Sequence, residues 1–341
     1  MIALRPTDTP PKEAGKAYAL GSLCGEIYYI PFSKSAMRLL VTGEVSEGAI
    51  ALVSTGGSKS DPIGFHYHRE AHDVFLCLKG HINIWADNQA RTMGPGDFAS
   101  VPPGITHQYQ ILGDHSEFIG IIVPGGWEEF FRFLGEPYAG AMWPMTDNRN
   151  PMEVLVPRLK EAAERFDMVP QPHLKSFDIQ PWADQGENND LPGAVRPYFL
   201  REGSGPAYQL GGSVVRVLAT SKESGGKFAI GSLEGSSFHR NEVLAAGLVF
   251  PSVHHAYHVV EGTIEFQVDG VSVDLTAAET LYVPKGKRCQ IRFVSRYAKT
   301  YVFASGGGLV ELFVKEGNPY SSPIIPETEP LVELGHIKQV N

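Results

Sequence analysis

Short apolar and β-branched runs, separated by Gly, Pro and Ser, dominate the pattern of hydrophobic and polar positions. In the first third of the chain the runs that predict strands are 26–31, 37–42, 49–54, 74–78, 81–85, 98–101, 107–112 and 118–123. Glycine and proline predict tight turns at 94–97 and 102–104. Many short strands with turn residues between them are typical of a sandwich or barrel. We therefore expect an all-β fold.

Two segments have helical spacing instead. Residues 127–134 combine aromatic and acidic side chains at that spacing, and apolar residues in 151–166 follow the 3.6-residue period of a helix. Pro157 interrupts the second segment and favours a helix start there. The polar, proline-rich stretch 168–189 predicts a connection between two domains.

A pattern in the first half of the chain recurs 182 positions downstream. In the first copy its members are His66, His68, Asp73, Gly80, Pro102, Gly104 and His107. In the second copy the same places hold Leu248, Phe250, His255, Gly262, Pro284, Gly286 and Cys289. Such a constant offset indicates duplication of one fold. We expect an N-terminal domain over 1–150, a helical and proline-rich linker over 151–190, and a C-terminal domain over 191–341.

Composition and charge exclude several classes of partner. The net charge is −9 without a Lys/Arg cluster, which argues against nucleic acid and anionic membranes. No apolar run is long enough to span a bilayer. The cysteines Cys24, Cys77 and Cys289 form no close pair in sequence and predict reduced thiols, of which Cys77 and Cys289 should be buried packing residues. With no signal core and no glycosylation sequon, we expect a cytoplasmic protein.

The first copy of the repeat carries residues suited to metal binding. His66 and His68 are two residues apart and project to the same face of a strand. Asp73 follows a bend, and the predicted turns let His107 return from another strand. Three imidazoles and one carboxylate form a site for one divalent transition metal, with Cu, Fe, Ni, Co, Mn and Zn all compatible.

Histidines elsewhere have other interpretations. His254, His255 and His258 look like a second metal cluster, but His255 takes the carboxylate position and the three imidazole positions hold Leu, Phe and Cys. We therefore expect one metal site, in the first half. His72 and His115 should be surface or hydrogen-bonded residues. Glu70 competes with Asp73, because residues 66, 68 and 70 share a face if the strand continues.

Several segments resemble the cupin family, and in particular the fungal quercetin 2,3-dioxygenases. These segments are 75–80, 84–86, 96–102, 106–111, 120–126 and 197–199. The resemblance implies two tandem cupin barrels (double-stranded β-helix, or jelly-roll), with one metal site in the N-terminal barrel and a degenerate C-terminal barrel. It implies that His66, His68 and His107 bind the metal, usually copper in the fungal enzymes. The family has a Glu as fourth ligand and proton acceptor. The family spacing assigns that place to Asp73 rather than Glu70.

The activity that the resemblance implies is a metal-dependent dioxygenase using O2 and an aromatic or phenolic small molecule, either a flavonol or a polyketide intermediate. Asp73 would accept the substrate proton, and Phe75, Tyr109 and Phe118 would line the pocket, although such aromatics otherwise belong to the core. One alternative is a non-oxidative metal enzyme of secondary metabolism, namely an isomerase, cyclase, dehydratase or decarboxylase. Another is a non-catalytic bicupin that binds a small molecule. The sequence also leaves a homodimer open.

Overall fold

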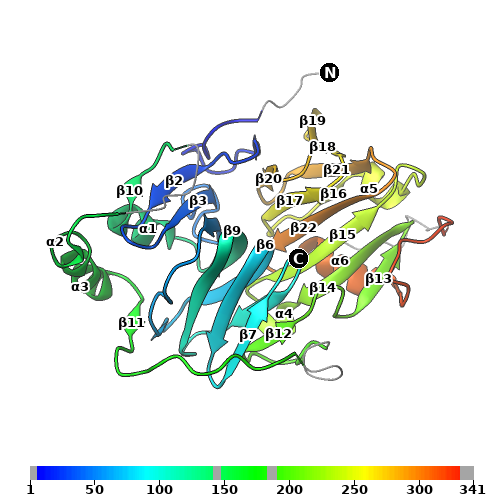
Figure 1. Ribbon diagram of the computed structural model, residues 1–341. Coiled ribbons are helices and arrows are strands. Elements are labelled where there is room, and N and C mark those ends of the chain that lie inside the picture. The colour runs from blue at the N-terminus through cyan, green and yellow to red at the C-terminus, as the bar shows by residue number, and fades with distance from the viewer. Residues whose placement is uncertain (1–5, 141–146, 183–189, 331–341) are drawn as a thin grey trace. The chain divides into compact units, whose positions relative to one another are not determined.

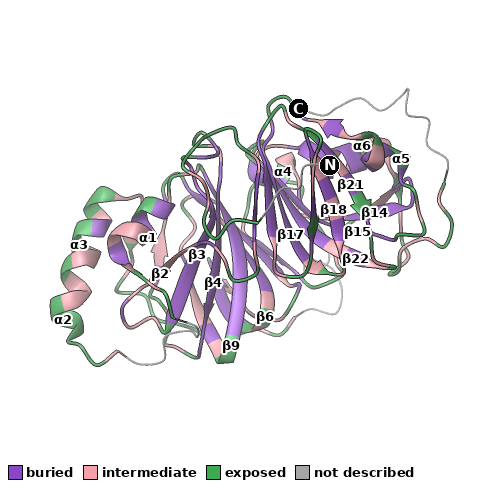
Figure 2. Cartoon of the chain, turned by 90° about the horizontal axis from the view of Figure 1, so that it is seen from above, coloured by how far each residue is buried: buried purple, intermediate pink, exposed green. Residues whose placement is uncertain are grey.

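The computed structural model describes residues 6–140, 147–182 and 190–330. The contacts within it divide the chain into two units. The N-terminal unit is Gly25–Glu202, and the C-terminal unit combines the described residues up to Cys24 with those from Gly203 onward. Antiparallel strands form the sheets of each unit (Figure 1), and the strands are largely buried (Figure 2). The predicted all-β fold is confirmed.

Eleven strands of the N-terminal unit form one sheet, whose main path runs β10-β2-β3-β4-β9-β6-β8-β12, with β5, β7 and β11 attached beside it. Their bounds are β2 Glu26–Tyr29, β3 Ser35–Val41, β4 Ala51–Gly57, β5 His66–Tyr67, β6 His72–Ala86, β7 Gln89–Met93, β8 Phe98–Val101, β9 His107–Val123, β10 Glu136–Pro137, β11 Val169–Pro170 and β12 Tyr198–Leu200.

The longest strands, β6 and β9, pair along most of their length, from His72 opposite Val123 to Ala86 opposite His107. The sequence predicts two strands in each of these stretches, on either side of Gly80 and of the 113–117 turn region. The structure joins each pair into one strand that bends at register shifts around residues 77–81. Gly80 adopts φ +63°, and a Cβ there would lie 2.5 Å from the carbonyl oxygen of His115. The bend therefore requires glycine.

The C-terminal unit has an eight-stranded sheet, β1-β20-β17-β22-β15-β14-β13-β23, and a four-stranded sheet, β16-β21-β18-β19. Its strands are β1 Tyr18–Leu20, β13 Ala207–Leu210, β14 Ser213–Ala219, β15 Ala229–Gly235, β16 Leu248–Val249, β17 His255–Glu261, β18 Ile264–Val268, β19 Val271–Leu275, β20 Thr280–Val283, β21 Arg288–Phe293, β22 Ala298–Ala304 and β23 Asn318–Pro319. Its helices are α4 Ser221–Ser224, α5 Glu242–Ala246 and α6 Gly308–Glu316. Gly262 repeats the geometry of Gly80, with φ +72° and a carbonyl oxygen 2.4 Å from the place that a Cβ would occupy.

Each unit takes one strand from the far side of the expected domain boundary. β1, at the start of the chain, pairs with β20 of the C-terminal unit. β12, which lies beyond the expected linker, pairs with β8 of the N-terminal unit. The expected boundaries at 150 and 190 stay predictions, while the contacts place the divisions after Cys24 and after Glu202.

The predicted helices are present. α1 spans Glu128–Leu134, and the segment 151–166 forms α2, Pro151–Val154, and α3, Val156–Arg165, which begins next to Pro157. The apolar faces of α1 and α3 pack together through a cluster that includes Phe130, Leu134 and Ala162. The stretch expected to be a linker, 168–189, is not a simple connection: it contains β11, which pairs with β5, while residues 183–189 lie outside the described part.

Two further expectations concern thiols and membranes. All three cysteines are thiols, and Cys77 and Cys289 are buried as expected. Burial raises the pKa of each of these two to about 12, so they are protonated and behave as packing groups. Among the helices of the described residues, none has the length and apolar character needed to cross a membrane.

Candidate active site

Three histidines of the N-terminal unit converge. β5 lies beside the start of β9, with His66 opposite His107, and this pairing brings their ring centroids to 4.5 Å. His68 follows β5, and its ring lies 5.1 Å from that of His66 and 5.2 Å from that of His107. One ring nitrogen from each residue lies within 4.8 Å of the other two, an arrangement that could hold a metal ion. The sequence-predicted triad is thus assembled.

Each of these imidazoles is oriented through its Nδ1 atom. His66 Nδ1 donates to the Gly64 carbonyl at 3.0 Å, and His107 Nδ1 donates to the Ile105 carbonyl at 2.9 Å. His68 Nδ1 makes a short hydrogen bond to the main-chain oxygen of Asp167. Because Nδ1 carries the proton in this tautomer, Nε2 is the atom that each ring offers as a ligand.

Asp73, the first inward residue of β6 after His72, completes the cluster. Its Oδ2 lies 3.3 Å from Nε2 of both His68 and His107. Although burial alone would raise it, the two histidines hold the pKa of Asp73 well below its usual range, so the carboxylate is ionised. Asp73 Oδ1 and His107 Nε2 are buried without a hydrogen-bond partner among the described residues. Unpartnered donor atoms of this kind, in a mixed N/O set, fit a transition metal.

Protonation states favour ligation at His66. Burial, followed by repulsion from His107 and His68, lowers the pKa of His66 to about 3, so its Nε2 carries a lone pair at neutral pH. At His68 burial opposes protonation, but the neighbouring carboxylate of Asp73 outweighs it and the pKa is raised. The site therefore presents a neutral imidazole beside a carboxylate–imidazole pair, and a bound cation would replace the proton shared by that pair.

The histidines and Asp73 open into a cavity of about 660 Å³ in the N-terminal unit. Its walls include the three aromatics predicted for the pocket: Phe75 lies 5.7 Å from Phe118 and 6.1 Å from Tyr109, and Tyr109 lies 5.0 Å from Phe118, between ring centroids. Such a volume with mostly apolar walls suits a small aromatic molecule.

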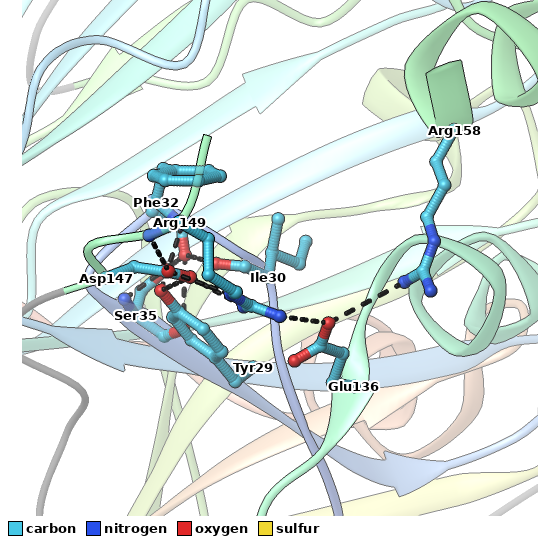
Figure 3. A network of polar contacts seen from close by, with 9 residues as sticks. Tyr29, Ile30, Phe32, Ser35, Glu136, Asp147, Arg149 and Arg158 are labelled. Carbon is cyan, nitrogen blue, oxygen red and sulfur yellow. Dashed lines mark hydrogen bonds and ion pairs between the residues drawn. The ribbon is translucent and has the colours of Figure 1, made fainter. Parts of the chain in front are cut away.

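One wall of the cavity, residues 30–35, is fixed from outside by a polar network (Figure 3). The main-chain N–H of Phe32, which has φ +68°, donates to the Tyr29 hydroxyl at 2.9 Å, and that hydroxyl donates to Asp147 at 3.0 Å. Arg149 holds both oxygens of Asp147, at 2.9 and 2.6 Å. The network thereby ties the loop between β2 and β3 to the segment that precedes α2.

Sequence reasoning missed the residues that the helices and the linker bring to the site. The ring of Trp127, just before α1, meets the edge of the His68 ring at 4.4 Å between centroids. Leu155 and Leu159, from the α2–α3 segment, line the cavity. Asp167 contacts His68 from 99 positions away in sequence. The helical pattern predicts that the leucines face an apolar surface, but no local signal links Asp167 to a histidine so distant in the chain.

The competing candidates lie elsewhere. Glu70 is exposed and does not line the cavity. His72 is buried and bonds the Ser100 hydroxyl at 2.8 Å, and His115 is exposed, as expected for both.

The positions equivalent to the ligands in the C-terminal unit are closed by side chains. Leu248, Phe250 and Cys289 are buried around His255, and the space among them is about 10 Å³. His254 instead bonds the Tyr282 hydroxyl at 2.7 Å, and His258 bonds Thr280 at 2.9 Å. Within the described ranges, the triad of the N-terminal unit is the one group of His, Cys, Asp or Glu arranged to hold a metal.

Comparison with known proteins agrees with this geometry. The family model described as "Cupin domain" matches residues 53–122, which carry all four site residues. The chain is 26% identical to the quercetin 2,3-dioxygenase of Bacillus subtilis (strain 168) over 325 residues, covering 94% of this chain and 91% of that protein. It is 27% identical to the quercetin 2,3-dioxygenase of Aspergillus japonicus over 313 residues, covering 85% and 89%.

A solved variant of the B. subtilis oxalate decarboxylase shares the fold of this chain, with a TM-score of 0.51 and 16% identity over 89% of this chain and 80% of that one. The match extends across both units, and the predicted tandem cupin fold is therefore confirmed. The predicted resemblance to bicupin quercetinases is confirmed as well, because the two relatives match along most of the chain.

Proposed function

We propose that this protein is a metal-dependent dioxygenase that acts on an aromatic, phenolic small molecule. The observation that carries the proposal is the convergence of His66, His68 and His107 beside Asp73 at the wall of an aromatic-lined cavity of about 660 Å³. The similarity to two quercetin 2,3-dioxygenases supports the reaction class, and a flavonol is the first substrate to examine.

The proposed ligands are the Nε2 atoms of the three histidines and Oδ2 of Asp73. Neighbouring ligands around a cation with bonds of about 2.1 Å lie roughly 3.0–3.4 Å apart. The 3.3 Å separations between Asp73 Oδ2 and two of the imidazoles fall in that range. These distances support Asp73 as a ligand, although its side chain is shorter than the Glu of the fungal enzymes. We propose copper from the resemblance to those enzymes, while Fe, Ni, Co, Mn and Zn suit the same donors.

A bound divalent metal would act as a Lewis acid toward a phenolate or enolate oxygen. Asp73 then has two separate tasks for its two oxygens. Oδ2 faces the imidazoles, whereas the buried and unpartnered Oδ1 can accept the proton of a substrate hydroxyl. Phe75, Tyr109 and Phe118 would pack on the aromatic substrate and exclude water. O2 is the oxidant: its O–O bond and a C–C bond of the substrate break, and both oxygen atoms enter the organic product.

The decisive experiment has two parts. Elemental analysis of protein purified without added metal should find one divalent transition metal per chain. Oxygen uptake with flavonols and simpler phenols should then depend on that metal and on His66, with His66→Ala inactive and the exposed-site variant His115→Gln fully active. Turnover that proceeds equally without O2 would instead favour the non-oxidative reactions, namely isomerisation, cyclisation, dehydration or decarboxylation, at the same site. Purified protein with a tightly bound small molecule but no metal would favour a binding protein.

A further inference from the structure

His68 differs from the other two histidines in what orients it. His66 and His107 each bond the carbonyl two residues earlier in their own strand segments. His68 bonds the main-chain oxygen of Asp167, which lies 99 positions later. The orientation of two candidate ligands is therefore local, whereas that of the third depends on a distant segment.

The side chain of Asp167 acts on the same region. Its Oδ1 accepts the main-chain N–H of Arg69 at 2.7 Å, and its Oδ2 accepts those of Glu70 at 2.7 Å and Ala71 at 3.2 Å. These three residues form the turn between β5 and β6, where a strand ladder cannot satisfy them. A carboxylate that accepts three amides fixes the turn, and the turn sets how His68 is placed relative to Asp73.

The residues after Asp167 extend this contact to a second histidine. In β11, Val169 pairs with Tyr67 and Pro170 pairs with His66. The N–H of Gln171 then donates to the Phe65 carbonyl at 2.7 Å. Upstream, α3 ends at Arg165. Residues 167–171 thus form a strap that follows α3 and runs along the segment carrying His66 and His68.

We propose that Asp167 is a positioning residue of the metal site, which holds the His68 imidazole with Nε2 toward the cavity and fixes the 69–71 turn. The inference rests on the proposed function, because it presumes that the triad binds metal. Outer partners that orient metal-bound histidines typically contribute 10- to 100-fold in affinity. An effect of that size is expected when the carboxylate of Asp167 is removed.

The test measures Cu(II) affinity by competition with a chelator, together with the electron paramagnetic resonance spectrum of the Cu(II)-loaded protein. Asp167→Asn keeps the size of the side chain but replaces one acceptor oxygen by an NH2 group that cannot accept the turn amides. We expect affinity to fall roughly 10- to 100-fold and the spectrum to change, because one imidazole shifts. The matched control is Glu164→Gln, an exposed carboxylate at the end of α3, which should leave both readouts unchanged.

A comparison with a double variant distinguishes the positioning of His68 by Asp167 from a purely structural role of Asp167. In a His68→Ala background, Asp167→Asn should cause little further loss of Cu(II) affinity, since the imidazole it orients is absent. If Asp167→Asn does not fold, Asp167→Glu replaces it in the same measurements of Cu(II) affinity and spectrum. This variant retains the charge but displaces it, so the same loss is expected. Wild-type affinity and spectrum in a folded Asp167 variant would overturn this inference and leave the proposed function intact. A wild-type protein that binds no Cu(II) or other divalent metal would overturn both.

Discussion

Nε2 of His255 accepts a hydrogen bond of 3.0 Å from the main-chain N–H of Leu309, at the start of α6. Burial is the main reason that the pKa of His255 is lowered from 6.5 to about 3. Between about pH 3 and pH 6.5, His255 is therefore protonated in the unfolded chain but neutral in the folded chain. Stability contributed by neutral His255 is complete above about pH 6.5 and declines as the pH falls toward 3.

We expect acid to destabilise the C-terminal unit through this residue by up to about 4 kcal/mol between pH 7 and pH 3.5. Urea unfolding of the metal-free protein across that range should show the loss. His255→Gln, which keeps an acceptor without titrating, should be less stable at pH 7 but lose less stability on acidification. His115→Gln, at an exposed site, should follow the wild type. Equal slopes for His255→Gln and wild type would contradict the assignment.

Metal removal should destabilise the N-terminal unit. A ligand present at about 100 times its Kd stabilises the folded state by about 2.7 kcal/mol, so thermal unfolding should shift upward on metal addition and return after chelation. His107→Ala should abolish the shift because it removes a proposed ligand. His255→Gln should preserve a stoichiometry of one metal per chain, which calorimetric titration would measure.

Asp73 variants should separate ligation from proton transfer. Asp73→Asn retains an oxygen near the imidazoles but removes the base, so kcat should fall about 10²- to 10⁴-fold. Its metal affinity should fall by a smaller factor. Asp73→Glu restores the carboxylate of the fungal enzymes and should retain both metal and activity. A folded, metal-loaded Asp73→Asn with normal kcat would remove the proton-acceptor role.

Tyr109 should contribute to substrate binding through its hydroxyl. The ring lines the cavity, and its hydroxyl makes no hydrogen bond within the described part of the chain. Burial and the charge of Asp73 raise its pKa, so the group remains a neutral donor. Tyr109→Phe should raise KM about 2- to 10-fold for a phenolic substrate with little change in thermal stability. Tyr208→Phe, in the other unit, should leave KM unchanged.

A buried ion pair should dominate the stability of the sheet behind the cavity. Arg38 and Glu117 have 1% and 2% exposed side chains and are bonded to each other and to Ser54. Removing one partner leaves a buried charge, so Glu117→Ala should cost about 3–5 kcal/mol of unfolding free energy. The double variant Arg38→Met/Glu117→Leu should recover much of this in urea unfolding. Glu161→Ala, from an exposed pair, should cost under about 1 kcal/mol.

The strand pattern predicted the β fold because it depends on local periodicity, and the repeat at a constant offset predicted two copies of that fold. The alternation that places His66 and His68 on one face is a property of neighbouring residues. Gly80 and Gly262 identified the repeat because the same left-handed bend excludes other side chains at both positions. The sequence predicted that the C-terminal copy lacks the three imidazoles, because Leu248, Phe250 and Cys289 stand in their places; that these side chains close the space is a finding of the structure.

What the sequence did not reveal depends on contacts between distant segments. The ion pair of Arg38 and Glu117 is one such contact, because the two residues are 79 positions apart and neither gives a local sign of burial. Asp167 lies in a stretch whose polar, proline-rich composition is typical of a connection. Its hydrogen bonds to the 69–71 turn arise only when α3 ends beside that turn. The composition of a segment indicates how polar and flexible it is. The roles of Glu117 and Asp167 depend instead on which distant segments the folded chain places beside them.

The terminal strands make each half of this tandem repeat depend on sequence encoded outside it. β1 completes the sheet edge at β20, and β12 completes the edge at β8. A gene cut at its midpoint would yield two fragments, each with an uncovered edge open to aggregation. Fragments with covered edges are instead expected from a circular permutation in which residues 6–24 follow the second repeat. One fragment would then be residues 25–202, and the other would join residues 203 onward to residues 6–24. Each copy of the repeat therefore needs one strand from outside its own sequence to cover a sheet edge.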